Sequence, residues 1–184
     1  MISEIKSCKK CNLYINQLPL LDLPHKNAIM VVGLSAKKMS SCEEQPLSDH
    51  TRSGKLVSSM EDIAQNYGYT IYRTNLVKCV PLDSAGKIRY PSSSEINFCF
   101  NHIIREIQEI HPPIVILFGK IVQKAFEHHL RIDLTCNNGC SFDVQHSGNI
   151  ALVPVYHPSY ILRSKERVTN YLKNFENLLS EMRG

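Results

Sequence analysis

The chain has 184 residues, of which 43% are hydrophobic, enough for one sizeable core and too few for two comfortable domains. Its formal net charge of +4 favours a polyanionic partner only weakly. Residues 1–10 hold no apolar run, and no stretch of about 18 apolar residues follows, which argues against secreted and membrane-spanning classes. We therefore expect a cytoplasmic, monomeric protein without a membrane partner.

Short apolar strands alternate with amphipathic helices along the chain. Strands are predicted at residues 28–33, 70–77, 114–118 and 150–155, and helices at 56–67, 95–110, 119–129 and 167–182. Ser92 or Ser93 is the expected N-cap of the second helix, and His111-Pro112-Pro113 ends it. The alternation predicts an α/β fold, a three-layer α/β/α sandwich around a mostly parallel four-stranded sheet. We expect one domain over residues 1–184, with an N-terminal arm over residues 1–26.

Four of the seven cysteines have the spacing of a metal site. Cys8 and Cys11 form a Cys-x-x-Cys pair on the arm, Cys79 follows the second strand, and Cys99 lies early in the next helix. Four thiolates can hold a tetrahedral zinc ion or a [4Fe-4S] cluster, and the spacing does not choose between them. Taken alone, Cys79 and Cys99 also fit ordinary core positions. The other cysteines are expected to be plain thiols: Cys42, Cys136 and Cys140.

Five segments in order resemble the family 4 uracil-DNA glycosylases, and together they span nearly the whole chain. They are Cys8-Lys9-Lys10-Cys11-Asn12-Leu13, Thr74-Asn75-Leu76-Val77-Lys78-Cys79-Val80-Pro81, Pro91 to Cys99, Ile114-Val115-Ile116-Leu117-Phe118-Gly119-Lys120, and Val153-Pro154-Val155-Tyr156-His157-Pro158-Ser159. The resemblance implies a uracil-DNA glycosylase-like fold and a [4Fe-4S] cluster on Cys8, Cys11, Cys79 and Cys99, with residues 1–26 as the cluster-binding arm. It also implies a DNA partner that contains uracil or another modified base.

Two residues in these segments suit the excision of a base extruded from DNA. His157 can donate a hydrogen bond to the oxygen of the departing base as negative charge develops there. The Asn75 amide offers both a donor and an acceptor to a base edge, and its position resembles the uracil-reading asparagine of the family. In isolation, His157 also fits a loop cap and Asn75 an ordinary strand end.

The first strand departs from the family pattern. Where the family has Gly-Glu-Ala-Pro-Gly, with an acidic residue that helps to position water, this chain has Gly33-Leu34-Ser35-Ala36-Lys37. Gly33, Leu34 and Ser35 are still expected to line the base site. Leu47 stands where an aromatic residue would stack on the base, so we expect weaker stacking. Asp49 and His50 are candidates to replace the missing group, Asp49 as the catalytic one, although both equally fit a solvated loop.

Phosphate contacts are expected from two regions. Lys87 and Arg89 belong to a basic loop beside the site, and the alternative for both is solvent-facing charge. A second group follows the third and fourth predicted strands and offers backbone N–H groups, a hydroxyl and a positive charge: Gly119, Lys120 and Ser159.

Three functions remain compatible with the sequence. The first is a DNA glycosylase with altered specificity or a slow rate. A DNA-binding relative that has lost hydrolysis together with the acidic residue is the second. The third is a zinc-stapled α/β module without a nucleic-acid role.

Overall fold

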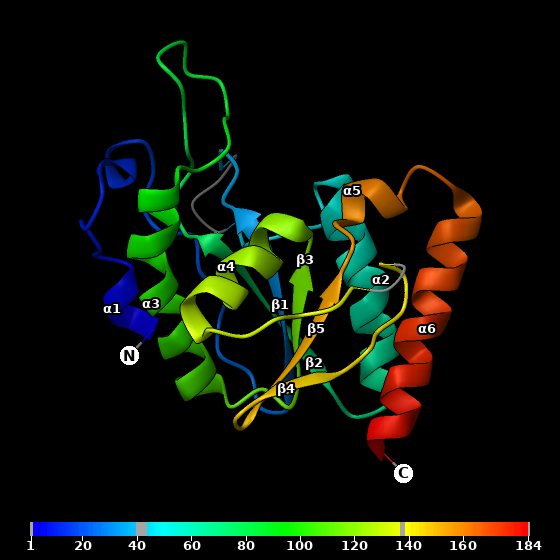
Figure 1. Ribbon diagram of the computed structural model, residues 1–184. Helices are drawn as coiled ribbons and strands as arrows, with labels where there is room; N and C mark the ends of the chain where they lie inside the picture. The colour runs from blue at the N-terminus through cyan, green and yellow to red at the C-terminus, as the bar shows by residue number, and fades with distance from the viewer. Residues whose placement is uncertain (1, 40–43, 137–138, 184) are drawn as a thin grey trace.

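The computed structural model describes residues 2–39, 44–136 and 139–183. Its elements, in chain order, are α1 (Ile2–Ile5), the 3-10 helix η1 (Asn12–Ile15), β1 (Ala28–Ser35), α2 (Arg52–Asn66), β2 (Thr70–Val77), α3 (Ser93–Ile110), β3 (Val115–Phe118), α4 (Lys120–Leu130), β4 (Gln145–Ser147), β5 (Ile150–Val155), α5 (Pro158–Ile161) and α6 (Lys165–Arg183). Helices α1, α3 and α4 cover one face of the sheet and α2 and α6 the other, which confirms the three-layer α/β/α architecture (Figure 1).

Within the described residues the strands form one sheet in the order β2-β1-β3-β5-β4. β2, β1, β3 and β5 are parallel, and β4 pairs antiparallel with β5 at the edge. The prediction of four strands was therefore one short. β4 has only three residues, Gln-His-Ser, and this short polar segment carries no apolar strand pattern.

The sheet is buried on both faces because its strands carry long apolar runs. Ile29 and Val31 of β1 pack with α2 and α6, whereas Met30 and Val32 pack with α3 and α4. This alternation follows from the two-residue period of a strand. The sheet therefore gives a rigid support for loops at its edge.

Two helix starts show how local sequence sets the elements. Ser92 caps α3 in a capping box with Glu95, which confirms one of the two expected caps. Thr51 caps α2 by accepting a hydrogen bond from the Gly54 N–H, so α2 begins at Arg52, before the predicted residue 56. In the described part of the chain, no helix is both long and apolar enough to cross a bilayer.

Candidate functional site

The carboxyl ends of β1, β2 and β5 meet at one edge of the sheet, the upper edge in Figure 1. From β1 the chain continues to β2 on one side and later to β3 on the other side, so the strand order reverses at β1. Ligands commonly bind at such a topological switch point. Two adjoining pockets of about 310 and 210 Å³ open here and share four residues. We call them together the edge pocket; the shared residues are Ser35, Leu47, Asn75 and His157.

Asn75 presents an amide to the edge pocket from β2. The residue is only 3% exposed, and its side chain has no hydrogen-bond partner among the described residues. Gly33 is its register partner on β1, and a Cβ atom at Gly33 would lie 2.5 Å from Asn75 Oδ1. A nearly buried amide without an internal partner is unusual in proteins and is available to a ligand.

His157 enters the same pocket from the end of β5. It caps α5, and its Nδ1 accepts a hydrogen bond of 3.1 Å from the Ser159 N–H. Because Nδ1 accepts, the neutral ring carries its proton on Nε2. Burial lowers the pKa of His157 below its ordinary value, which favours this neutral form. The ring is therefore set up as a neutral hydrogen-bond donor.

The backbone N–H groups of Gly119 and Ser159, which were predicted to contact phosphates, already donate hydrogen bonds within the chain. The Gly119 N–H donates to the Val155 carbonyl at 2.8 Å, and the Ser159 N–H is taken by His157. Gly119 has φ of 90°, and a Cβ atom there would lie 3.2 Å from the Cβ of His157. These residues position His157, whereas Lys120 is exposed at the start of α4.

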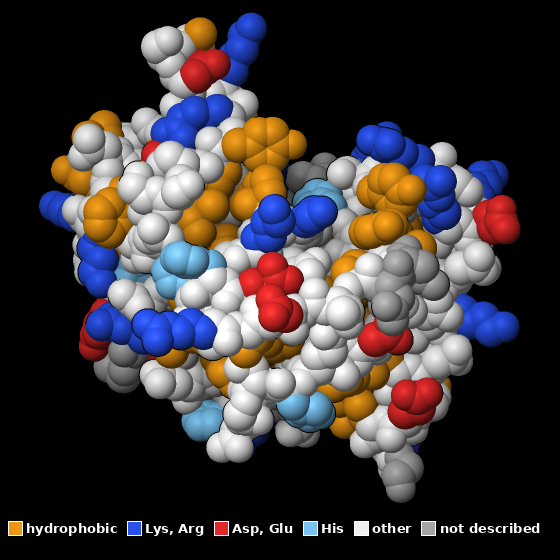
Figure 2. Space-filling view, viewed as in Figure 1, with side chains coloured by type: hydrophobic (Ala, Val, Ile, Leu, Met, Phe, Trp, Pro, Cys, Tyr) orange, Lys and Arg blue, Asp and Glu red, His pale blue; other side chains and the backbone are white. Residues whose placement is uncertain are grey.

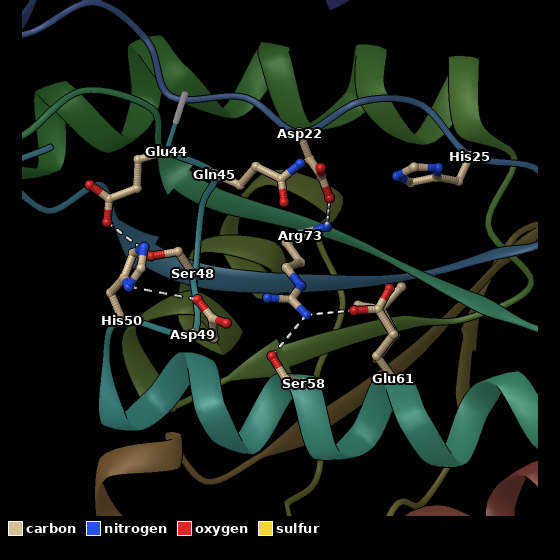
Figure 3. Close-up of a pocket in the computed structure, with 11 residues that line it drawn as sticks. Asp22, His25, Glu44, Gln45, Ser48, Asp49, His50, Ser58, Glu61 and Arg73 are labelled. Atoms are coloured by element: carbon tan, nitrogen blue, oxygen red, sulfur yellow. Dashed lines mark hydrogen bonds and ion pairs between the residues drawn. The ribbon is translucent and has the colours of Figure 1, made fainter. Parts of the chain in front are cut away.

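Leu47 reaches the pocket from a loop held in a strained conformation. Its φ of 51° lies in the left-handed region, which costs a leucine about 1–2 kcal/mol. Arg73 of β2 donates a hydrogen bond of 3.1 Å to the Leu47 carbonyl, and it also binds Ser58 and Glu61 of α2 at 3.2 and 2.6 Å (Figure 3). Strain of this kind persists where the surroundings enforce it, and it is common at functional sites.

The structure does not bring Asp49 together with His157. Asp49 and His50 line a separate polar pocket of about 500 Å³, around Arg73 and Asp22 (Figure 3). The Asp49 side chain is 69% exposed there. The proposed replacement of the missing carboxylate by Asp49 is therefore not supported by the geometry, since the loop carries Leu47 to one pocket and Asp49 to the other. No described residue that lines the edge pocket is Asp or Glu.

Residues 82–90 form a projecting loop beside the edge pocket, drawn in green at the top of Figure 1. The Arg89 side chain is engaged inside the chain: Nη1 and Nη2 bind the Glu95 carboxylate at 2.9 and 2.6 Å, and Nε donates to the Leu82 carbonyl. This pairing raises the pKa of Arg89. Arg89 thus fastens the loop to α3, while Lys87 is exposed to solvent.

Sequence reasoning missed two features of this edge. Ile88 and Tyr90 line the edge pocket, and Tyr160 stands just beyond His157 with the guanidinium groups of Arg163 and Arg167 over its ring, 5.3 and 4.6 Å from the centroid. In Figure 2 the upper end of the molecule is hollowed and carries Lys and Arg side chains on both sides. No clear signal in the sequence marks this group, because Tyr160 lies in α5, Arg163 lies between the helices and Arg167 lies in α6.

The four predicted ligand cysteines gather beside α3. Cys79 and Cys99 are each 5% exposed and pack with Leu13, and Cys11 packs against them. Burial, together with the neighbouring thiols of Cys99, Cys11 and Cys8, raises the pKa of the Cys79 thiol to about 12. All four thiols therefore lie within electrostatic reach of one another. Among the described residues, no three His, Cys, Asp or Glu side chains are arranged to hold a single metal ion.

Polar groups surround this thiol group in a way that the sequence did not suggest. His102 Nε2 lies 3.1 Å from the Cys8 sulfur, and its buried Nδ1 has no partner within the described structure. Lys78, which precedes Cys79, forms a fully buried ion pair with Glu106 of α3. A donor set of four thiols fits a soft, cationic group larger than one ion, such as an iron–sulfur cluster. Cys136 and Cys140 are half-buried cysteines elsewhere in the chain, and Cys42 lies outside the described residues.

Comparison with known proteins decides the family. The model of the uracil DNA glycosylase superfamily matches residues 22–183. The chain belongs to the uracil DNA glycosylase superfamily. A type-4 uracil-DNA glycosylase of Sulfurisphaera tokodaii is 30% identical over 97% of this chain and 78% of the relative. Type-4 uracil-DNA glycosylases of Archaeoglobus fulgidus and Thermotoga maritima are 23% and 24% identical, over 97% and 90% of this chain and 89% and 83% of the relatives. This likeness confirms the resemblance to family 4.

Proposed function

We propose that this member of the superfamily is a DNA glycosylase that accepts an extruded uracil, or a related deaminated base, and hydrolyses its N-glycosidic bond. The observation that carries the proposal is the convergence of the Asn75 amide and the His157 ring on one pocket. One group can read a base edge and the other can stabilise the base as it leaves. The type-4 names of the relatives support the same activity.

In the proposed reaction, the bond between the base nitrogen and the sugar C1′ breaks and its electron pair stays on the base. His157 Nε2–H donates to the base oxygen on which this charge accumulates, as donors do in an oxyanion hole. Asn75 holds the base edge with its NH₂ and carbonyl groups. Water then adds to C1′ and loses a proton to solvent. The described edge pocket supplies no carboxylate to orient or deprotonate that water. We therefore propose that the rate enhancement comes from stabilisation of the leaving base alone.

We also propose that Cys8, Cys11, Cys79 and Cys99 hold a [4Fe-4S] cluster. The convergence of four thiols in an apolar setting supports this assignment, as does the likeness to type-4 enzymes. A four-iron cluster is larger than one ion, so its ligands can lie farther apart than the ligands of a single-ion site. Bound there, the cluster would tie the arm and α3 to the end of β2 and would take no part in the proposed bond cleavage.

A panel of DNA duplexes tests the activity directly. Duplexes with uracil, hypoxanthine, xanthine or mismatched thymine are incubated with the protein, and alkaline cleavage reveals abasic sites. We expect product from uracil or another deaminated base, and His157→Ala should lower the single-turnover rate by about 10²-fold or more. His146→Ala changes an exposed histidine of β4 and is the matched control. If none of the substrates gives an abasic product, the proposed hydrolysis is overturned.

A second candidate function is recognition of the base without hydrolysis. The observation in its favour is the lack of Asp and Glu among the described residues of the edge pocket. The same panel separates the two candidates, because a binding protein would retain a preference for uracil-containing DNA over matched DNA and would leave the base attached.

A further inference from the structure

Tyr90 stands out because its ring is exposed while its backbone is firmly held. The side chain is 75% exposed. Its carbonyl accepts a hydrogen bond of 3.0 Å from Arg89 Nη1, and the same guanidinium is held by Glu95. The capping box of Ser92 and Glu95 fixes the chain just beyond it. A large aromatic surface left in water on an ordered backbone suits contact with a ligand.

The loop that carries Tyr90 is closed on itself as well. Leu82 and Ile88 form an antiparallel bridge, and the Asp83 carboxylate accepts hydrogen bonds of 2.9 and 2.8 Å from the Ala85 and Lys87 N–H groups. Ile88 is two residues before Tyr90 and is also largely exposed, at 54%. Both side chains line the edge pocket, so the loop turns an apolar side toward it.

The other described walls of the edge pocket carry no Phe, Tyr or Trp ring on which a base could stack. Leu34 and Leu47 are aliphatic, and Asn75 and His157 are polar groups that serve the base edge. Tyr90 brings the single Phe, Tyr or Trp ring among the described residues that line either half of the pocket. An aromatic ring on a base face contributes about 1–3 kcal/mol to binding, whichever base is present.

We propose that Tyr90 stacks on the face of the extruded base and forms the aromatic wall of the base site. This inference rests on the proposed function, since it needs a base in the edge pocket. Stacking would hold the ring plane of the base, and Asn75 would choose among bases by their edges. Tyr90 is thus a binding residue contributed by the projecting loop, and it offsets the small surface that Leu47 offers.

The chain contains no tryptophan, so Tyr90→Trp creates a protein with a single tryptophan. The probe is an oligonucleotide that carries an uncleavable uracil nucleotide, compared with the same oligonucleotide carrying an abasic analogue. We expect the uracil probe to quench the emission of the tryptophan at position 90 at least about twofold more than the abasic probe, because only uracil offers a ring to stack on. Tyr69→Trp, just before β2 and at the opposite edge of the sheet, is the matched control and should respond equally to both probes.

Affinity measurements with the same probes supply a second test. Tyr90→Leu should weaken binding of the uracil probe by about tenfold and leave binding of the abasic probe unchanged, while Tyr90→Phe should bind both like the parent. Equal loss for both probes, or no loss, overturns the stacking role. If uracil quenches the tryptophan and no base is excised, stacking holds and hydrolysis fails. If the parent excises uracil and quenching is the same for both probes, the proposed function holds and this inference fails.

Discussion

Gly33 and Asn75 are register partners on β1 and β2, and a Cβ atom at position 33 would lie 2.5 Å from Asn75 Oδ1. Real side chains do not approach so closely, so any other residue at position 33 must displace the amide. The glycine is needed here for space, and its backbone is part of an ordinary β-strand. The position of the base-reading amide thus depends on the absence of a side chain on the neighbouring strand.

Gly33→Ala should therefore lower single-turnover excision of uracil by about tenfold or more, because the amide no longer stands where the base edge lies. Rates are measured with enzyme in excess over uracil-containing duplex. The control is a double-mutant cycle: in an Asn75→Ala background, Gly33→Ala should have little further effect. The same loss in both backgrounds would mean that Gly33 acts through Leu47, whose Cδ2 would lie 3.3 Å from the added Cβ.

The excision rate should fall at low pH, on the acid limb of its pH profile, because His157 becomes protonated. Burial lowers its pKa, so the neutral donor form persists below the ordinary value of about 6.5. Protonation puts a hydrogen on Nδ1 and breaks the bond from the Ser159 N–H, which disturbs the cap of α5. Excision should stay level as the pH falls to about 6.5 and then decline as the pH passes the lowered pKa.

Single-turnover rates between about pH 5 and 8 check this limb. His157→Gln, which has no group that titrates in this range, should be slow and should lack the acid limb. A parent rate that rises toward low pH would identify the imidazolium as the active form and contradict the tautomer assigned from the Ser159 contact.

Much of this site could be predicted because parallel strands end at one edge of a sheet. The apolar runs of β1, β2 and β5 were readable, and the resemblance implied one base site for Asn75 and His157. Both residues line the edge pocket, and Gly33 lies directly beside the Asn75 amide. The capping box at Ser92 was equally local. These features depend on short-range pattern and on the geometry of strands.

Contacts between distant segments could not be read from the sequence. The path of the loop that separates Leu47 from Asp49 is set by Arg73, 26 residues after Leu47, and by the close approach of Gly54 to the Ser48 carbonyl. Arg89 looked like a phosphate contact, yet the carboxylate of Glu95 takes its guanidinium group. Such outcomes depend on tertiary neighbours, which override local pattern.

Cys79→Ala should remove iron and sulfide from anaerobically purified protein and lower its thermal stability, because the ligands join the arm to β2 and α3. Iron, sulfide and colour are measured together with the unfolding temperature. Cys136→Ala changes a half-buried cysteine outside the group and should leave the iron content intact. Full iron and sulfide in Cys79→Ala would show that the ligand set is wrong. Zinc instead of iron in the parent protein would show that the cysteines hold a single ion and no cluster.

Replacement of Lys87 and replacement of Arg89 should affect DNA binding in different ways. Lys87→Ala should make the log–log dependence of affinity on salt shallower by about one unit, since an exposed lysine can meet a phosphate. Arg89→Ala should instead loosen the loop, because Glu95 and the Leu82 carbonyl lose their partner. Limited proteolysis of residues 82–90 reports this loosening. If Arg89→Ala changes the slope of affinity against salt by a full unit and proteolysis is no faster, Arg89 contacts a phosphate as the sequence predicted.

The Arg73 guanidinium holds Leu47 in its left-handed conformation, so its replacement should cost more than a hydrogen bond on the surface. In Arg73→Lys a single ammonium cannot reach the Leu47 carbonyl, Ser58 and Glu61 together as the planar fork does. We expect the free energy of unfolding to fall by about 1–3 kcal/mol, measured by urea denaturation. Uracil excision should fall as well, because Leu47 no longer lies against the pocket.

A glycine at position 47 isolates the conformational part of this effect. Glycine adopts positive φ without the penalty that leucine has, so a Leu47→Gly chain needs less help to keep its turn. Arg73→Lys should therefore destabilise the Leu47→Gly background less than it destabilises the parent. Glu61→Gln weakens the ion pair and leaves the bond to Leu47 intact, so its cost should be the same in both backgrounds. Equal costs of Arg73→Lys in the two backgrounds would show that Arg73 stabilises α2 alone and that the strain at Leu47 is maintained by the close packing of Gly54 against the Leu47 and Ser48 carbonyls.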